Sequence, residues 1–258
     1  MNIRRACLVT LTVSSLLAGA VAGAAAQDGA TPVEPLPERV LFVGNSHTAR
    51  NGGLEWQIEN FVSAEDPVRA FEGEAMTHGG VTLAYHWQNG ARDRIRTGDF
   101  DAVVLQGYLT GAETRTAEPF LEHARLLHEE VRGSGAKTVF FMTWPRGFDD
   151  WSDMTDVIEA HRTLEAELGV PVAPAAYAFQ LAKAERPELE LMSEDHVHAS
   201  WDGAYLAAAT VYATLFDHSP EGLPYSLGIE PDDAAFLQRI AWQALREWRE
   251  GAALAAAG

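Results

Sequence analysis

Short apolar runs and segments with apolar residues at helical spacing alternate along the chain between residues 39 and 249. The apolar runs, typical of β-strands, are Arg39–Val43, Val68–Phe71, Ala102–Leu105, Thr138–Met142 and Val170–Ala173. The segments with helical spacing are Leu54–Val62, Leu83–Ile95, Pro119–Val131, Met154–Leu168, Asp202–Phe216 (with Asp202 as its expected N-cap) and Pro231–Arg249. This alternation predicts an α/β fold: a single-domain, three-layer α/β/α sandwich whose mostly parallel sheet has about five strands.

The first 26 residues have the pattern of a secretory signal peptide. Arg4 and Arg5 form a basic start, an apolar stretch follows, and Ala24–Ala26 form a small-residue cleavage site. The apolar stretch is shorter than the roughly 20 residues that span a bilayer, although an N-terminal membrane anchor is the alternative interpretation. We therefore expect a secreted or periplasmic protein with no membrane span.

Composition narrows the classes of protein further. Residues 27–37 are rich in proline and polar residues and are expected to be a linker, which leaves residues 38–252 as one domain. The only cysteine, Cys7, lies in the predicted signal peptide, which excludes disulfides, thiolate metal sites and a cysteine nucleophile in the mature chain. A formal net charge of −18 disfavours nucleic acid as a partner.

Two short segments about 150 residues apart carry the candidate chemistry. Ser46 follows the first apolar run, and Asp195 and His198 form one D-x-x-H unit late in the chain. A serine attacks a carbonyl at neutral pH only with an adjacent base, and that base needs a third group to orient it. These three residues could supply all three roles. Ser46 could instead cap a helix, and His196 is a rival base.

Several of these residues are expected to meet at one edge of the sheet. In an open parallel sheet, ligands bind beyond the carboxyl ends of the strands. Ser46 follows the first predicted strand, Gly79 and Gly80 follow the second by a few residues, and Gln106 ends the third. Asp195 and His198 come after the last strand. The two glycines could also serve only a turn that needs positive φ.

Five sequence blocks resemble the SGNH (GDSL-type) hydrolase superfamily, in particular the branch with GNS in place of GDS in the first block. The blocks are GNSHT at Gly44–Thr48, GGVTL at Gly79–Leu83, VVLQG at Val103–Gly107, DHVHAS at Asp195–Ser200 and GAYLAA at Gly203–Ala208. The resemblance covers essentially the whole domain at residues 38–252. It implies the SGNH-hydrolase, flavodoxin-like version of the predicted sandwich, and a catalytic role for the domain.

The resemblance also implies roles for single residues. Ser46 would be the nucleophile, His198 the general base and then the general acid, and Asp195 the carboxylate that orients His198. The backbone N–H groups of Ser46 and Gly80 would form the oxyanion hole. The superfamily usually adds an asparagine from a GxND block; this chain has Gln106 at that place, whose amide can donate a similar hydrogen bond.

Further polar residues near the site have two interpretations each. Trp144 and Arg146 follow the fourth predicted strand and are either substrate contacts or loop-packing residues. His47, His78 and His86 suggest a zinc site, but their spacing fits no helical ligand pair and no acidic motif completes the set. We therefore expect no metal and no cofactor.

The sequence as a whole predicts a secreted serine esterase that hydrolyses short-chain, acetyl-type carboxylic esters through an acyl-enzyme on Ser46. Its partner would be a small-molecule or carbohydrate ester, and the expected export together with the family resemblance favours an O-acetylated carbohydrate. One alternative is a non-catalytic ligand- or carbohydrate-binding module on the same fold. The other is an O-acyltransferase that uses the same residues.

Overall fold

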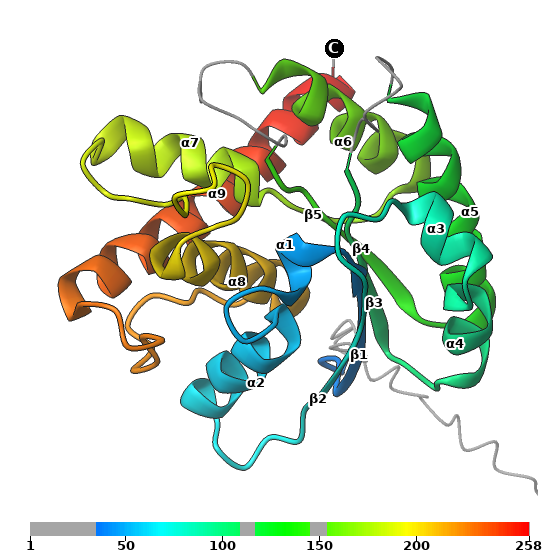
Figure 1. The fold of residues 1–258 in the computed structure, drawn as a ribbon, viewed down its shortest axis with the longest axis horizontal. Coiled ribbons are helices and arrows are strands. Elements are labelled where there is room, and N and C mark those ends of the chain that lie inside the picture. Colours follow the sequence, from blue (N-terminus) through cyan, green and yellow to red (C-terminus); the bar gives the residue numbers. More distant parts are fainter. Residues whose placement is uncertain (1–34, 109–116, 145–153, 258) are drawn as a thin grey trace, which may run out of the picture. The chain divides into compact units, whose positions relative to one another are not determined.

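The computed structural model describes residues 35–108, 117–144 and 154–257, so the predicted signal peptide lies outside the described residues. Its core is one five-stranded sheet, in the order β2-β1-β3-β4-β5, with every neighbouring pair parallel (Figure 1). The strands are β1 (Arg39–Gly44), β2 (Glu72–Thr77), β3 (Ala102–Leu105), β4 (Lys137–Phe141) and β5 (Val172–Ala173). This confirms the predicted α/β class and the parallel five-stranded sheet, in the flavodoxin-like strand order.

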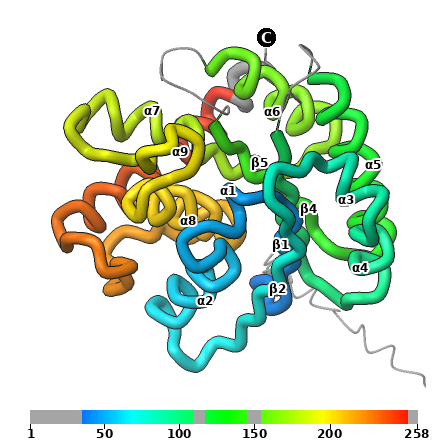
Figure 2. The backbone as a smooth tube through the Cα atoms, viewed as in Figure 1, coloured from blue at the N-terminus to red at the C-terminus, as the bar shows by residue number. Residues whose placement is uncertain are grey.

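Helices cover both faces of the sheet. They are α1 (Ser46–Ala49), α2 (Leu54–Glu65), α3 (Leu83–Gln88), α4 (Ala91–Thr97), α5 (Glu118–Ser134), α6 (Thr155–Leu168), α7 (Ala175–Glu185), α8 (Trp201–Phe216) and α9 (Pro231–Ala257). Helices α2, α7, α8 and α9 pack together on one side, and α3, α4, α5 and α6 pack on the other (Figures 1 and 2). No helix within the described ranges has the length and apolar character needed to cross a membrane.

The central strands are buried because both of their faces meet helices. Residues Val40–Val43 of β1 are fully buried, and Val103–Leu105 of β3 are at most 1% exposed. These are the runs that are nearly continuously apolar in sequence, as expected for strands covered on both faces. Burying each such side chain stabilises the fold by about 1.5–3 kcal/mol. The two strands pair in register with Leu41 beside Val103, which places their carboxyl ends together.

The second predicted strand was misplaced. Residues Val68–Phe71 precede the observed strand β2, and Val68 is 88% exposed in a turn where its N–H donates to Asp66 Oδ1. The strand itself, EGEAMT, is mostly polar. It lies at the edge of the sheet with β1 as its one neighbour, so it needs no continuous apolar run.

Three helical details also differ from the prediction. The predicted helix Leu83–Ile95 is two helices, because Gly90 adopts a left-handed conformation with φ of 97° between α3 and α4. The N-cap of α8 is Ser200, whose Oγ accepts a hydrogen bond from the Gly203 N–H at 3.1 Å, and not Asp202. The helices α1 and α7 were not predicted.

The buried side chain of His161 makes the stability of the fold depend on pH. Burial lowers the pKa of His161 to about 4, and its Nδ1 donates to the Val157 carbonyl. The unfolded chain binds this proton near pH 6.5, so stability is present above that pH and is lost as the pH falls toward 4. The loss should reach about 3 kcal/mol, at 1.36 kcal/mol per pKa unit. Chemical denaturation of His161→Gln should show a shallower decline over this pH range; an unchanged decline would assign it to other groups.

Candidate active site

Ser46 lies in a tight turn at the carboxyl end of the central strand β1. Asn45 has an extended backbone and caps α1: its Oδ1 accepts a hydrogen bond from the His47 N–H at 3.0 Å. Ser46 is the first helical residue, and its Oγ is 2.8 Å from His198 Nε2. The helix-capping role considered for Ser46 therefore belongs to Asn45, which leaves the Ser46 hydroxyl facing the histidine.

Glycine is required immediately before this turn. A Cβ on Gly44 would lie 2.7 Å from Gln106 Oε1 and would also collide with Thr48 Oγ1. The absence of a side chain lets the first turn of α1 close over β1 and β3. The same strand end is held from the other side by His86, whose Nε2 donates to the Gly44 carbonyl at 2.8 Å.

The side chain of Gln106, at the end of β3, holds the Ser46 turn by hydrogen bonds. Its Oε1 accepts hydrogen bonds from the Asn45 N–H at 2.9 Å and from the Thr48 hydroxyl at 3.0 Å. Its Nε2 faces Thr143 Oγ1 at 3.4 Å, and the residue is 1% exposed. The Gln106 amide is buried and its hydrogen bonds are made within the protein, and its donation to a substrate oxyanion stays a prediction. We interpret Gln106 as a residue that holds the Ser46 turn on β3.

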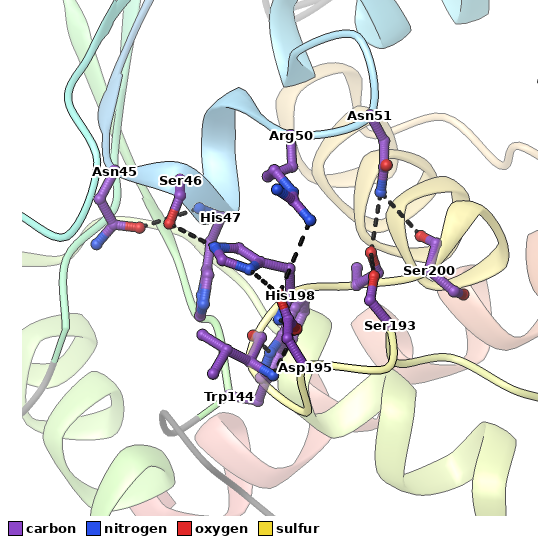
Figure 3. Close-up of polar contacts among 12 residues, drawn as sticks. Asn45, Ser46, His47, Arg50, Asn51, Trp144, Ser193, Asp195, His198 and Ser200 are labelled. Carbon is purple, nitrogen blue, oxygen red and sulfur yellow. Dashed lines mark hydrogen bonds and ion pairs between the residues drawn. The ribbon is translucent and has the colours of Figure 1, made fainter.

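His198 is oriented by the D-x-x-H unit. Asp195 Oδ1 accepts the N–H groups of Val197 at 3.0 Å and His198 at 2.9 Å, which closes a tight turn. Asp195 Oδ2 lies 2.7 Å from His198 Nδ1, so Nδ1 carries the proton and Nε2 is free to accept one from Ser46 (Figure 3). The hydrogen bonds from the His198 side chain and from the two backbone N–H groups lower the pKa of Asp195, which keeps its carboxylate ionised.

The structure thus brings Ser46, His198 and Asp195 into one chain of hydrogen bonds, although 152 residues separate Ser46 from His198. This is the arrangement of nucleophile, base and orienting acid used in acyl transfer. His196, the rival base, is exposed and has a positive φ of 52°. Arg50 adds a cation at the edge of the site, with Nη2 3.8 Å from Asp195 Oδ2.

Two backbone N–H groups are candidates for the oxyanion hole. Gly80 is exposed with a φ of 72°, and a Cβ there would meet no atom within 4 Å. Asn45 Nδ2 donates to the Val81 carbonyl at 3.0 Å, which ties the Gly80 loop to the Ser46 turn. Within the described ranges, neither the Ser46 nor the Gly80 N–H donates to a backbone carbonyl. Both groups therefore suit a developing negative charge on a substrate oxygen.

Trp144 packs against the loop that carries His198 and does not lie on the surface. It is 2% exposed, its Nε1 donates to the Val197 carbonyl at 2.9 Å, and its ring stacks on Phe179 at 4.2 Å. These contacts agree with the loop-packing interpretation of Trp144, and a contact with substrate stays a prediction. Arg146, predicted beside it, lies outside the described residues.

His47 is a member of the site that sequence reasoning considered only as a metal ligand. Its ring stacks on Trp144 at 5.0 Å and meets the His198 ring edge-on at 5.8 Å. His47 therefore lies between the supporting tryptophan and the base. Its position directly after Ser46 in the GNSHT block could have indicated that His47 belongs to the site.

The three histidines of the zinc alternative make different contacts. His78 stacks on Tyr85 at 5.4 Å, while His86 is buried and hydrogen bonded to Gly44, and this burial lowers its pKa. Across residues 35–108, 117–144 and 154–257, no group of three histidine, cysteine or carboxylate side chains could hold a metal ion.

The hydrogen bond from Trp144 to the Val197 carbonyl, in the loop that carries His198, can be tested by Trp144→Phe. This change keeps an aromatic ring but leaves the Val197 carbonyl without its donor, so we expect kcat to fall about tenfold through loss of His198 positioning. Trp248→Phe is the matched control, since Trp248 is also 2% exposed and its Nε1 donates to Glu165. Steady-state kinetics should show a loss only at residue 144; equal losses would mean a general effect on stability.

Comparisons with known proteins agree with this fold. No family model matches the chain, and no curated protein matches it. Among solved structures, a DUF4886 family protein from Bacteroides uniformis is 19% identical, with a TM-score of 0.61 over 81% of this chain and 95% of that one. Axe2, an acetylxylan esterase from Geobacillus stearothermophilus, is 14% identical, with a TM-score of 0.57 over 74% and 95%.

A third solved structure shares this fold. The lipase/acylhydrolase from Enterococcus faecalis is 15% identical, with a TM-score of 0.54 over 68% of this chain and 93% of that one. In each case nearly the whole of the other chain is matched by the α/β domain described above. The chain therefore shares its α/β fold with these three solved structures.

Proposed function

We propose that this protein is a secreted or periplasmic serine esterase that hydrolyses short-chain, acetyl-type carboxylic esters through an acyl-enzyme on Ser46. The observation that carries the proposal is the continuous chain from Ser46 Oγ to His198 Nε2 at 2.8 Å and from His198 Nδ1 to Asp195 at 2.7 Å. A serine that only caps or packs has no need of an oriented histidine at its hydroxyl.

The proposed reaction has two halves. Ser46 Oγ attacks the ester carbonyl while His198 Nε2 takes its proton, and the resulting oxyanion accepts hydrogen bonds from the Ser46 and Gly80 N–H groups. The alcohol then leaves with the proton from His198, which leaves the acyl group on Ser46. Water attacks this ester with His198 again as base, and His198 then returns the proton to Ser46 Oγ as the carboxylic acid departs. Asp195 stays ionised throughout and stabilises the imidazolium that forms twice.

One observation favours a short, acetyl-type acyl group and a carbohydrate alcohol. The likeness of the fold to that of an acetylxylan esterase supports an O-acetylated carbohydrate as the substrate class.

The test is turnover and active-site labelling of the purified protein. It should hydrolyse p-nitrophenyl acetate faster than p-nitrophenyl octanoate, and a fluorophosphonate should label it at Ser46, as peptide mass mapping would show. The absence of both turnover and labelling would instead favour the binding-module hypothesis. Export is tested separately: expression of the full chain in a bacterium should yield a periplasmic or secreted product that begins at Gln27.

A further inference from the structure

The corner between α1 and α2 has an unusual backbone. Three consecutive residues have positive φ: Asn51 at 53°, Gly52 at 90° and Gly53 at 89°. Asparagine and glycine are the residues that tolerate this region most readily. The corner is fixed from inside by Gln57 of α2, which is 2% exposed and whose Nε2 donates to the Asn51 carbonyl at 3.0 Å. The side chain of Asn51 is thereby directed out of its own corner.

That side chain reaches the segment that follows the catalytic histidine. Asn51 Nδ2 donates to the carbonyls of Ala199 and Ser200, both at 3.0 Å (Figure 3). An amide nitrogen has two hydrogens, and both are used here. Ala199 directly follows His198 in the chain. The two hydrogen bonds therefore connect the corner that follows α1 to the end of the loop that carries His198 and to the N-cap of α8.

The loop on the receiving side is closed on itself. Ser193 donates its N–H to the His198 carbonyl and its hydroxyl to the Ala199 carbonyl, both at 2.8 Å. With Asp195 binding the His198 N–H as well, residues 193–199 form a compact unit. A shift of this unit relative to α1 would move the whole His198 ring with respect to Ser46.

We propose that Asn51 is a positioning residue that holds His198 at hydrogen-bond distance from Ser46. The proposal rests on the proposed esterase function. The N–H of Arg50, the C-cap of α1, donates to the Ser46 carbonyl directly before Asn51, so Ser46 and Asn51 belong to one short hydrogen-bonded segment. The two hydrogen bonds from Asn51 tie this segment to the loop that carries His198. A displacement of about 1 Å between reacting groups can lower the rate by about 10²-fold, so this connection should matter for kcat.

The first test is Asn51→Asp, which keeps the size of the side chain and its tolerance of positive φ. It places a carboxylate against two carbonyl oxygens, and the repulsion should push the loop away. We expect kcat on p-nitrophenyl acetate to fall about 10- to 100-fold while KM changes less than about threefold. The matched control is Asn60→Asp on α2, where the amide also donates to a backbone carbonyl, that of Trp56 at 2.7 Å. This control should retain wild-type kcat.

A second experiment separates positioning from a general loss of structure. In the His198→Ala background there is no base to position, so adding Asn51→Asp should cost almost nothing further. A full additional loss there would overturn the proposal, as would an Asn51→Asp enzyme as active as Asn60→Asp.

If Asn51→Asp does not fold, Asn51→Gly keeps the backbone conformation and should lower kcat about tenfold in the same way. A wild-type protein that neither hydrolyses the ester nor reacts with a fluorophosphonate would overturn the esterase function itself, whereas an active wild type with an unaffected Asn51 variant overturns this inference alone.

Discussion

Replacing Ser46 with alanine is expected to lower kcat for p-nitrophenyl acetate by about 10⁴-fold or more while the protein remains folded. The reason for the large effect is that Ser46 Oγ is the atom that His198 Nε2 contacts at 2.8 Å, and no acyl-enzyme can form without it. The reason for intact folding is that Asn45, not Ser46, caps α1, so the substitution removes no capping hydrogen bond. Steady-state kinetics with a thermal unfolding curve measure both parts.

Ser134→Ala is the matched control for this variant. Ser134 is the last residue of α5. Its hydroxyl donates to a carbonyl of the same helix, that of Val131, at 2.8 Å. It should retain wild-type kcat, and fluorophosphonate labelling should persist in this control and disappear in Ser46→Ala. An alanine variant at position 46 that retained more than a tenth of the activity would move the chemistry to another residue.

The fold was predictable where burial alone determines a segment. The central strands β1, β3 and β4 are buried on both faces, so their apolar runs stand out in the sequence, and β3 was predicted with its observed bounds. The edge strand β2 was not, because a strand with a single neighbour can be polar and leaves no such run. The break between α3 and α4 had a signal in the dipeptide Asn89–Gly90, a frequent turn sequence.

The candidate site was predictable where chemistry determines residue type. A nucleophile, a base and an acid must be particular residues, so Ser46, His198 and Asp195 could be proposed before any geometry was known. Supporting residues have no such requirement. Gln106 could have faced the substrate or the turn beneath it, and only the positions of Asn45 and Thr48 determine which.

Trp144 and Asn51 are also supporting residues, whose partners the sequence does not indicate. Trp144 was expected at the carboxyl edge of the sheet and is there, but its contact with the Val197 carbonyl depends on how the catalytic loop folds back over β4. Asn51 acts across 148 residues of sequence on the Ala199 carbonyl, and no local pattern encodes that partner. The sequence therefore indicates candidate reacting groups more readily than the residues that hold them in place.

The choice between His198 and His196 as the base gives the second large effect. His198→Ala should abolish esterase activity nearly as fully as Ser46→Ala, because Asp195 orients the His198 ring and the ring faces Ser46. His196 is exposed, and its N–H donates to the Ser193 carbonyl within the loop. His196→Ala should therefore cost about tenfold at most, through disturbed positioning of the loop. Kinetics of the two single variants at one pH measure this ranking.

The kcat of the double variant Ser46→Ala/His198→Ala, compared with that of each single variant, tests whether the two residues act together. Because nucleophile and base act as a unit, the combined substitution to alanine should be scarcely worse than either single one. Combining Ser46→Ala with His196→Ala cannot distinguish the two histidines, so the informative partner is Asp195→Asn. That change keeps the shape of the side chain but removes the charge that holds the proton on His198 Nδ1, and kcat should fall by about 10⁴-fold. An active His198→Ala beside an inactive His196→Ala would reverse the assignment, and the hydrogen bond between His198 and Ser46 would then have no part in the reaction.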